Sequence, residues 1–274
     1  MIKIASMVGA PDLETSTLAP YSGDLGLAFK KLSALGYDGI ELMTKQPAFL
    51  DGPAVRQLLS ANQLVLAGLC TGHIFGEDRL GLVTPELQIE PRSVERLKEF
   101  IDLAAFFEPG TLVNIGRSRG LGDPQRKEAT LHTAAEAIQD LASYAQPRQV
   151  RIILEPITSK EASFIHSTLD GMELVRLVNR PNFGLMLDTY HMFLEDADMI
   201  ASLYEAAPFC WHMHISDSNR CYPGSGKIRF DQVIAALNDF GFNGFAGTEI
   251  KPWPDPDSAA RLSIEYLRKL IPVT

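Results

Sequence analysis

Four short, mostly apolar segments of the sequence each end on a side chain that can bind a metal ion. They read Arg151-Ile-Ile-Leu-Glu155, Phe183-Gly-Leu-Met-Leu-Asp188, Cys210-Trp-His-Met-His214 and Phe245-Ala-Gly-Thr-Glu249. Short apolar runs of this kind are typical of buried strands, so the four terminal side chains are expected at strand ends. On adjacent strands, three carboxylates and one imidazole repel one another unless they are protonated, paired or neutralised by a cation.

A divalent metal ion is the simplest such cation. A ligand set of mainly oxygen with one imidazole and no thiolate favours Mn²⁺ or Mg²⁺, with Co²⁺ or Zn²⁺ as alternatives. Any single acid at a strand end can instead cap a helix or pair with a lysine. Because four candidate ligands end four successive segments, we expect Glu155, Asp188, His214 and Glu249 to bind one metal ion.

Further polar residues lie within or just after the predicted strands. His191 is expected in a loop, either polarising a substrate carbonyl or as a surface side chain. Arg220 offers a rigid donor fork to vicinal oxygens or a phosphate, or else pairs with Asp217. His212, on the same face as His214, is expected to be a hydrogen-bonded core residue.

The first half of the chain contributes weaker candidates. His73 follows the third strand and is a possible pocket residue, whereas Glu41 either contacts substrate or holds the barrel rim together. The loop Gly116-Arg117-Ser118-Arg119-Gly120 either cradles a phosphate or exposes surface arginines. Residues 71–90 show little periodicity, which favours a loop that covers the site.

Eight strands alternating with helical segments are needed to position these residues. The expected strands are Ile2–Val8, Gly39–Leu42, Leu64–Cys70, Thr111–Ile115, Arg151–Glu155, Phe183–Asp188, Cys210–Ile215 and Gly244–Ile250. This alternation is typical of parallel βαβ units, and eight of them predict a single (β/α)8 barrel that spans residues 1–274. An open doubly wound sheet is the alternative. Gly184 and Gly247, on the ligand-bearing faces, fit a crowded barrel interior.

One helix-to-strand joint occurs twice, in Gly36-Tyr37-Asp38-Gly39 and Gly241-Phe242-Asn243-Gly244. Each first glycine is expected to take the left-handed conformation that ends a helix, and each aromatic residue is expected to pack back. The second glycine of each joint begins the next strand. The repeat supports successive units of one kind.

The composition is that of an ordinary globular protein, with 46% hydrophobic and 22% charged residues. The net charge of −9 argues against general attraction to nucleic acid or to an anionic membrane. Three cysteines without CxxC spacing suggest reduced thiols, and no stretch is apolar enough to span a membrane. We therefore expect a cytoplasmic protein that binds neither nucleic acid nor membrane.

The motifs in the second half of the chain resemble those of the D-tagatose 3-epimerase group, within the xylose isomerase-like TIM barrels of sugar and sugar-phosphate isomerases and epimerases. The resemblance rests on Glu155-Pro156 with Glu161, on Asp188-Thr-Tyr-His191, on His214 with Arg220, and on Gly247-Thr-Glu249. It covers residues 150–250 closely. The segment Pro156-Ile-Thr-Ser-Lys160 departs from the bulkier pattern usual in the group, which affects the expected sugar specificity.

The resemblance implies roles for single residues. Glu155, Asp188, His214 and Glu249 match the positions that hold the group's metal ion, usually Mn²⁺, and Glu155 and Glu249 match its catalytic acid and base. Glu161, His191 and Arg220 match positions that contact the substrate. The implied reaction is epimerisation of a sugar or sugar phosphate through a metal-stabilised enediolate. Barrels of the group are often homodimers or homotetramers.

Other activities use the same kind of site. Return of the proton to the neighbouring carbon would give aldose–ketose isomerisation, as in a hydroxypyruvate-type isomerase, and loss of a hydroxyl would give an inosose dehydratase. A sugar-binding protein without turnover is another alternative. A DNA-repair enzyme like the apurinic-site endonucleases is more distant, because the fourth strand ends Asn114-Ile115-Gly116 without the additional histidine that a zinc cluster needs.

Overall fold

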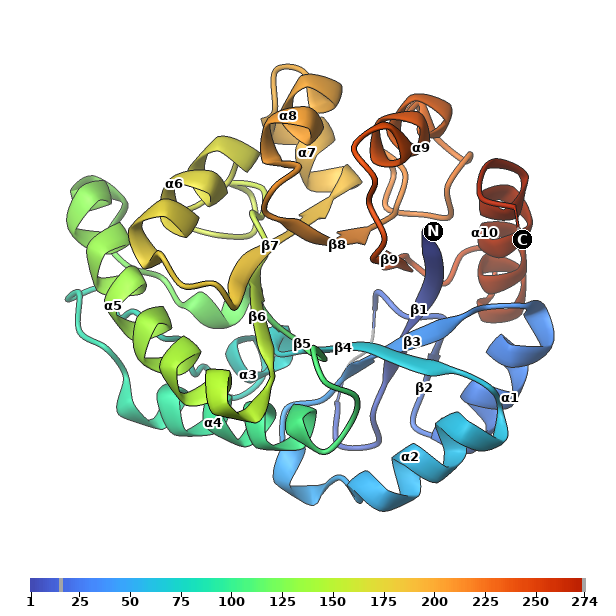
Figure 1. The fold of residues 1–274 in the computed structure, drawn as a ribbon, viewed down its shortest axis with the longest axis horizontal. Helices are drawn as coiled ribbons and strands as arrows, with labels where there is room; N and C mark the ends of the chain where they lie inside the picture. Colours follow the sequence, from blue (N-terminus) through green and yellow to red (C-terminus); the bar gives the residue numbers. More distant parts are fainter. Residues whose placement is uncertain (15–16, 273–274) are drawn as a thin grey trace.

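The computed structural model describes residues 1–14 and 17–272, and its strands form a closed parallel barrel. Figure 1 shows the ring of strands at the centre with the helices around it. The barrel strands are β1 (Lys3–Gly9), β3 (Gly39–Met43), β4 (Val65–Cys70), β5 (Leu112–Ile115), β6 (Arg151–Leu154), β7 (Phe183–Asp188), β8 (Cys210–His214) and β9 (Phe245–Thr248). Neighbours in sequence pair in that order, and β9 pairs with β1, which closes the ring and confirms the predicted barrel over the open sheet.

The helices form the outer layer of the barrel. They are α1 (Leu25–Leu35), α2 (Gly52–Ala61), α3 (Gly72–Gly76), α4 (Pro91–Ala105), α5 (Lys127–Ala145), α6 (Thr168–Val178), α7 (Thr189–Glu195), α8 (Met199–Ala206), α9 (Phe230–Asp239) and α10 (Pro256–Leu270). The main hydrophobic core lies between these helices and the strands. Among the described residues, no helix is long and apolar enough to cross a membrane.

The eight predicted strands are observed, with ends that shift by one or two residues. Glu155 and Glu249 each stand directly after their strand instead of ending it. The sequence did not predict β2 (Tyr21–Ser22), which pairs with the end of β1 outside the ring. Apart from this additional strand, the differences lie at strand ends, where a single ladder hydrogen bond decides the boundary.

The repeated joint between helix and strand has the predicted geometry. Gly36 and Gly241 have φ of +89° and +75°, which places both in the left-handed region that glycine adopts without strain. The amides of Tyr37 and Phe242 each donate to a carbonyl of the preceding helix, at 3.1 and 2.8 Å. Each joint therefore ends its helix and turns the chain directly into the next barrel strand.

The barrel interior is as crowded as the glycines on its inner faces indicate. A Cβ atom placed on Gly184 would lie 2.6 Å from Cδ2 of Trp211, and one on Gly247 would lie 3.2 Å from Nε2 of His212. Trp211 is an extra residue in the register, because Leu185 pairs with Cys210 whereas Met186 pairs with His212. After this irregularity, Asp188 pairs with His214, so the two candidate ligands lie side by side.

Asp170 stabilises the start of α6 in a pH-dependent manner. Partial burial alone would raise its pKa, but Lys127 and the amides of Ser167 and His166 together lower the pKa to about 2. Because this lies below the value of about 3.9 for an unfolded chain, the stabilisation is present above about pH 4 and is lost as the pH falls towards 2. We expect Asp170→Asn to cost about 1–2 kcal/mol at pH 7, after allowance for solvent screening.

Urea unfolding of both proteins at pH 7, 4 and 3 measures this effect. The difference in the free energy of unfolding between wild type and Asp170→Asn should narrow as the pH falls below 4. A difference that stays constant across this range would contradict the assignment.

Candidate active site

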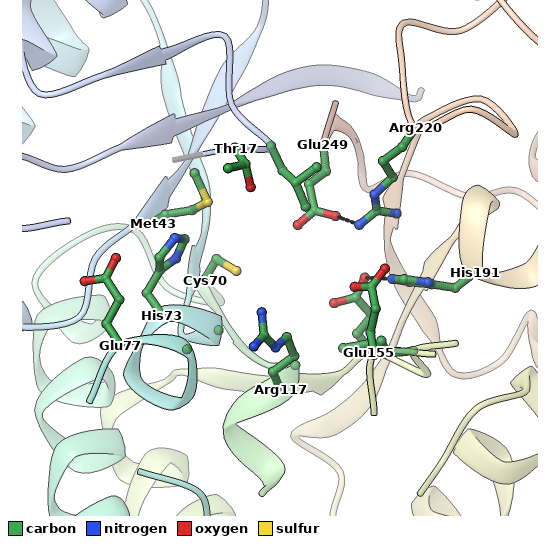
Figure 2. Close-up of a pocket in the computed structure, with 16 residues that line it drawn as sticks. Thr17, Met43, Cys70, His73, Glu77, Arg117, Glu155, His191, Arg220 and Glu249 are labelled. Carbon is green, nitrogen blue, oxygen red and sulfur yellow. Dashed lines mark hydrogen bonds and ion pairs between the residues drawn. The ribbon is translucent and has the colours of Figure 1, made fainter. Parts of the chain in front are cut away.

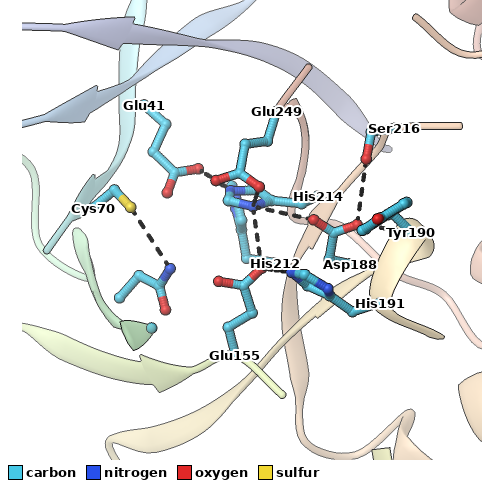
Figure 3. Close-up of polar contacts among 12 residues, drawn as sticks. Glu41, Cys70, Glu155, Asp188, Tyr190, His191, His212, His214, Ser216 and Glu249 are labelled. Atoms are coloured by element: carbon cyan, nitrogen blue, oxygen red, sulfur yellow. Dashed lines mark hydrogen bonds and ion pairs between the residues drawn. The ribbon is translucent and has the colours of Figure 1, made fainter. Parts of the chain in front are cut away.

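The four predicted metal ligands come together at the carboxyl ends of β6 to β9. Glu155 and Glu249 follow β6 and β9, whereas Asp188 and His214 are the last residues of β7 and β8. All four are buried, and one ligand atom from each lies within 4.8 Å of the others (Figure 3). Parallel strands place their carboxyl ends on one face of a barrel, so residues far apart in sequence meet there.

Local hydrogen bonds fix the strand ends that carry these ligands. The Arg119 guanidinium donates to the carbonyl of Glu155 at 2.5 Å, and Pro156 follows directly. Asp188 caps α7, because its Oδ1 accepts the amide of Tyr190 at 2.7 Å. The amide of Ile250 donates to the carbonyl of Leu18 and anchors the chain just after Glu249. The backbone next to Glu155 and Glu249 and the side chain of Asp188 are therefore held within the fold itself.

Glu41 sets the orientation of His214 from the barrel interior. Its Oε2 accepts hydrogen bonds from Nε2 of His212 at 2.8 Å and from Nε2 of His214 at 2.9 Å. Because an ionised carboxylate only accepts, both imidazoles carry a proton on Nε2. These two histidines outweigh the effect of burial and lower the pKa of Glu41 to about 2. The remaining nitrogen of His214, Nδ1, therefore faces the candidate metal ligands.

Within the described part of the chain, two buried atoms of the cluster, His214 Nδ1 and Glu155 Oε1, lack the hydrogen-bond partners that buried polar atoms usually have. Nδ1 lies 3.7 Å from Glu155 Oε1, 3.9 Å from Asp188 Oδ2 and 3.6 Å from Glu249 Oε2. These separations are too long for hydrogen bonds, and both His214 Nδ1 and Glu155 Oε1 are buried without a hydrogen-bond partner among the described residues. A cation placed between them would pair with both of these atoms and would bring positive charge next to all three carboxylates.

Arg220 supplies part of the positive charge that this cluster requires. Its Nη1 lies 2.6 Å from Asp188 Oδ2, and its Nη2 forms an ion pair with Glu249. Arg220 thus offsets one of the three negative charges, and a divalent cation would offset the other two. Asp217, the alternative partner, instead accepts the amides of Ser218, Gly224 and Ile228 and folds the following loop.

The pKa shifts follow from burial and from these neighbours. Burial raises the pKa of Glu155, and burial together with Glu249 and Glu155 raises the pKa of Asp188 to about 7 despite Arg220. The pKa of Glu249 is lowered, because Arg220 and His214 outweigh its burial. Burial would lower the pKa of His214, but Glu41 and Glu249 raise it well above its usual value. The site therefore attracts positive charge.

His191 is a neutral donor on a short helix, which corrects its expected place in a loop. It is buried on α7, and its Nδ1 accepts the amide of Thr158 at 3.3 Å. Burial and the nearby Arg220 hold its pKa well below the usual value. Its Nε2 therefore carries the proton and lies 3.7 Å from Glu155 Oε1, at the wall of a cavity.

This cavity of about 220 Å³ adjoins the four-residue cluster. Figure 2 shows Glu155 and Glu249 on different walls, with their carboxylates turned towards the space between them. Six predicted site residues line the cavity, namely His73, Glu155, Glu161, His191, Arg220 and Glu249. Glu161 is exposed at the mouth, whereas the buried Glu41 is not a lining residue and lies behind His214 instead. Of the two alternatives for Glu41, the structure favours the supporting one.

In residues 71–90 the structure shows a short helix and a buried segment where an irregular loop was expected, although four of these residues line the cavity, and the arginine loop has one exposed and one buried arginine. Residues 72–76 form α3, and buried Leu82 and Val83 are bonded to the carbonyls of Ser118 and Arg119. Arg119 is only 1% exposed, because its guanidinium donates to backbone carbonyls inside the fold, whereas Arg117 lines the cavity. Sequence reasoning also missed Met43 and Cys70 as lining residues, since apolar strand ends carry no distinctive signal.

Comparison with known proteins places this architecture among related barrels. Residues 29–270 match the family described as Xylose isomerase-like TIM barrel. An L-ribulose 3-epimerase from Methylomonas sp. is 27% identical over 257 residues, which cover 85% of this chain and 87% of that protein. A D-psicose 3-epimerase from Ruminiclostridium cellulolyticum is 24% identical over 258 residues and covers 88% and 87%. The crystal structure of a Methylomonas D-allulose 3-epimerase with D-allulose superposes with a TM-score of 0.78, 24% identity and 97% coverage of each chain.

Proposed function

Because the chain belongs to the xylose isomerase-like TIM barrel family, we propose that it is a divalent-metal-dependent ketose 3-epimerase acting on a sugar or sugar phosphate. The chain is an enzyme, and its curated relatives are named as epimerases of ketose sugars. The observation that carries the finer proposal is the pair Glu155 and Glu249, which line one cavity and share a four-residue cluster with Asp188 and His214.

Glu155, Asp188, His214 and Glu249 would hold the metal ion, since the unpartnered atoms of Glu155 and His214 and the residual negative charge of the cluster fit a divalent cation. Mn²⁺ is our first choice for this set of three carboxylates and one imidazole, ahead of Mg²⁺, Co²⁺ and Zn²⁺. When bound, the ion acts as a Lewis acid towards the sugar oxygens and so makes the carbon-bound proton beside the carbonyl more acidic.

The two glutamates move the proton. One glutamate, as the carboxylate, removes the proton from the carbon beside the carbonyl, and the other, as the carboxylic acid, gives its own proton to the opposite face of that carbon, which inverts the centre. Their separate walls of the cavity suit attack from two faces (Figure 2). Each positioned acid or base typically contributes about 10²- to 10⁴-fold to the rate.

Three further side chains orient the sugar. His191 presents Nε2–H to the cavity and can donate to the carbonyl or a hydroxyl oxygen. Arg220 lies at the cavity wall with its fork held by Asp188 and Glu249, so its remaining N–H groups can contact adjacent oxygens. Glu161, which is exposed at the cavity, can accept a hydrogen bond from a sugar hydroxyl.

Product analysis tests this function. The purified protein is incubated with ketohexoses, ketopentoses, their phosphates and an inosose, and the products are identified by NMR. We expect the C3 epimer of at least one ketose. An aldose product would instead indicate an isomerase, a dehydrated product would indicate a dehydratase, and the absence of any product would contradict the proposal.

Glu41 acts as a positioning residue for the metal site. In Glu41→Gln, the neutral amide is a weaker acceptor than the carboxylate and its NH₂ group cannot accept at all, so the proton on Nε2 of His214 is held less firmly. Loss of such a supporting contact typically lowers metal affinity about 10- to 100-fold. Competition with a chromophoric chelator measures the Mn²⁺ affinity without relying on activity. Unchanged affinity in a folded Glu41→Gln variant would contradict this role.

Several expectations from the sequence stay predictions. A homodimer or homotetramer, the cytoplasmic location and the absence of nucleic-acid binding are tested by sedimentation, by fractionation and by a DNA-binding assay respectively. The roles proposed for the residues around the cavity do not depend on any of these three expectations.

A further inference from the structure

We propose that Arg117 forms a subsite for an anionic group, a phosphate ester or a carboxylate, carried by the sugar at the end remote from the reacting carbon. This inference rests on the proposed function, because it names the substrate class of the same cavity. It starts from one unusual feature of the cavity wall. A single exposed arginine stands in a turn whose other residues are buried.

The turn that carries Arg117 is rigid. Arg117 begins the short 3-10 turn Arg117–Arg119, and the neighbouring residues Gly116, Ser118, Arg119 and Gly120 are all buried. Ser118 Oγ lies 2.6 Å from Thr71 Oγ1, and its carbonyl accepts the amide of Leu82 at 2.8 Å. The buried Arg119 ties the turn to the carbonyls of Glu155 and Ile165 at 2.5 and 3.1 Å. The backbone at Arg117 is thus held at a fixed position relative to the strand end that carries Glu155.

The Arg117 side chain reaches into the same cavity as the two glutamates. Figure 2 shows its guanidinium directed towards the space enclosed by Glu155, Glu249 and Cys70. It packs over α3, because its Cζ lies 5.9 Å from the ring centroid of Phe75, and a Cβ on Gly76 would lie 3.8 Å from Nη2. The guanidinium therefore lies alongside the end of α3.

Among residues 1–14 and 17–272, no carboxylate pairs with the charge of Arg117. The cavity's other arginine, Arg220, is paired with Asp188 and Glu249, and the acid on this side, Glu77, lies 2.7 Å from Lys45 Nζ. A guanidinium that faces a cavity without a carboxylate partner is suited to bidentate binding of phosphate or carboxylate.

Matched substrates and variants test the subsite. The rate of C3 epimerisation is measured for a ketohexose, its 6-phosphate and the corresponding ketohexuronate, with wild type, Arg117→Met, Arg117→Lys and the control Arg92→Met on the exposed start of α4. We expect wild type to prefer an anionic substrate, and Arg117→Met to lower the ratio of kcat/KM for anionic over neutral substrate by about 10- to 100-fold. Arg117→Lys should retain part of the ratio, and Arg92→Met should leave it unchanged.

The outcomes separate this proposal from the function on which it rests. The preferred anion identifies the group, phosphate or carboxylate. Epimerisation with a ratio that Arg117→Met does not change, or with a preference for the neutral ketose, would overturn the subsite alone. Calorimetric binding of the 6-phosphate gives a second readout that does not need turnover. Binding weakened by Arg117→Met in the absence of any epimerisation would support the subsite and overturn the proposed function.

Discussion

Glu249→Gln is expected to slow epimerisation and the exchange of the substrate's C3 hydrogen with solvent by about 10²- to 10⁴-fold. Glutamine keeps the shape of the side chain but cannot take up a proton. In the wild type, Glu249 lies between Arg220 and His214 at the cavity wall, with its carboxylate turned towards the cavity (Figure 2). Its loss removes one of the two groups that inversion requires.

The matched control is Glu205→Gln, which changes an exposed glutamate on α8. Glu205→Gln should retain the wild-type rate. Circular dichroism and thermal unfolding would show that Glu249→Gln is folded. A folded Glu249→Gln enzyme with the wild-type rate would exclude Glu249 as an acid or base.

Removal of the metal ion should abolish activity and lower stability. Without a divalent cation, Glu155, Asp188 and Glu249 remain close together, with Arg220 to offset only part of their charge. An ion present at 100 times its Kd stabilises the folded state by about 2.7 kcal/mol, which corresponds to about 5–10 °C in Tm for a chain of this size. Dialysis against a chelator followed by calorimetry and activity measurements tests both effects.

Addition of Mn²⁺ should restore the activity and the Tm of the chelated protein. Asp188→Asn should need a higher Mn²⁺ concentration, whereas Asp140→Asn, an exposed position on α5, should behave as the wild type. Full activity after exhaustive chelation, with no metal detected in the protein, would contradict the metal-dependent account.

The cluster of Glu155, Asp188, His214 and Glu249 and the barrel could be predicted because they follow from local patterns. Strand length and the alternation of side chains place Asp188 and His214 at strand ends, and parallel strands gather those ends on one face. The left-handed backbone conformation of Gly36 and Gly241 could likewise be predicted from the short motif that surrounds each glycine. Such inferences need only neighbours in sequence.

The surroundings of the cluster depend on long-range contacts that no local pattern contains. Glu41 meets His212 and His214 across the barrel, and Arg220 selects Asp188 and Glu249 over its sequence neighbour Asp217. Arg117 and Arg119 differ by two positions, yet one faces the cavity and the other is buried against backbone carbonyls. Only the packed fold distinguishes such residues.

Exchange in heavy water tests the central claim most directly. Metal-loaded wild-type protein is incubated with the ketose that it epimerises, and NMR follows the deuterium content of each carbon. The account predicts that deuterium enters at C3 in the product epimer, and that chelated protein shows no such exchange until Mn²⁺ is added. Epimer formation without deuterium at C3, or exchange at the same rate without a metal ion, would contradict it.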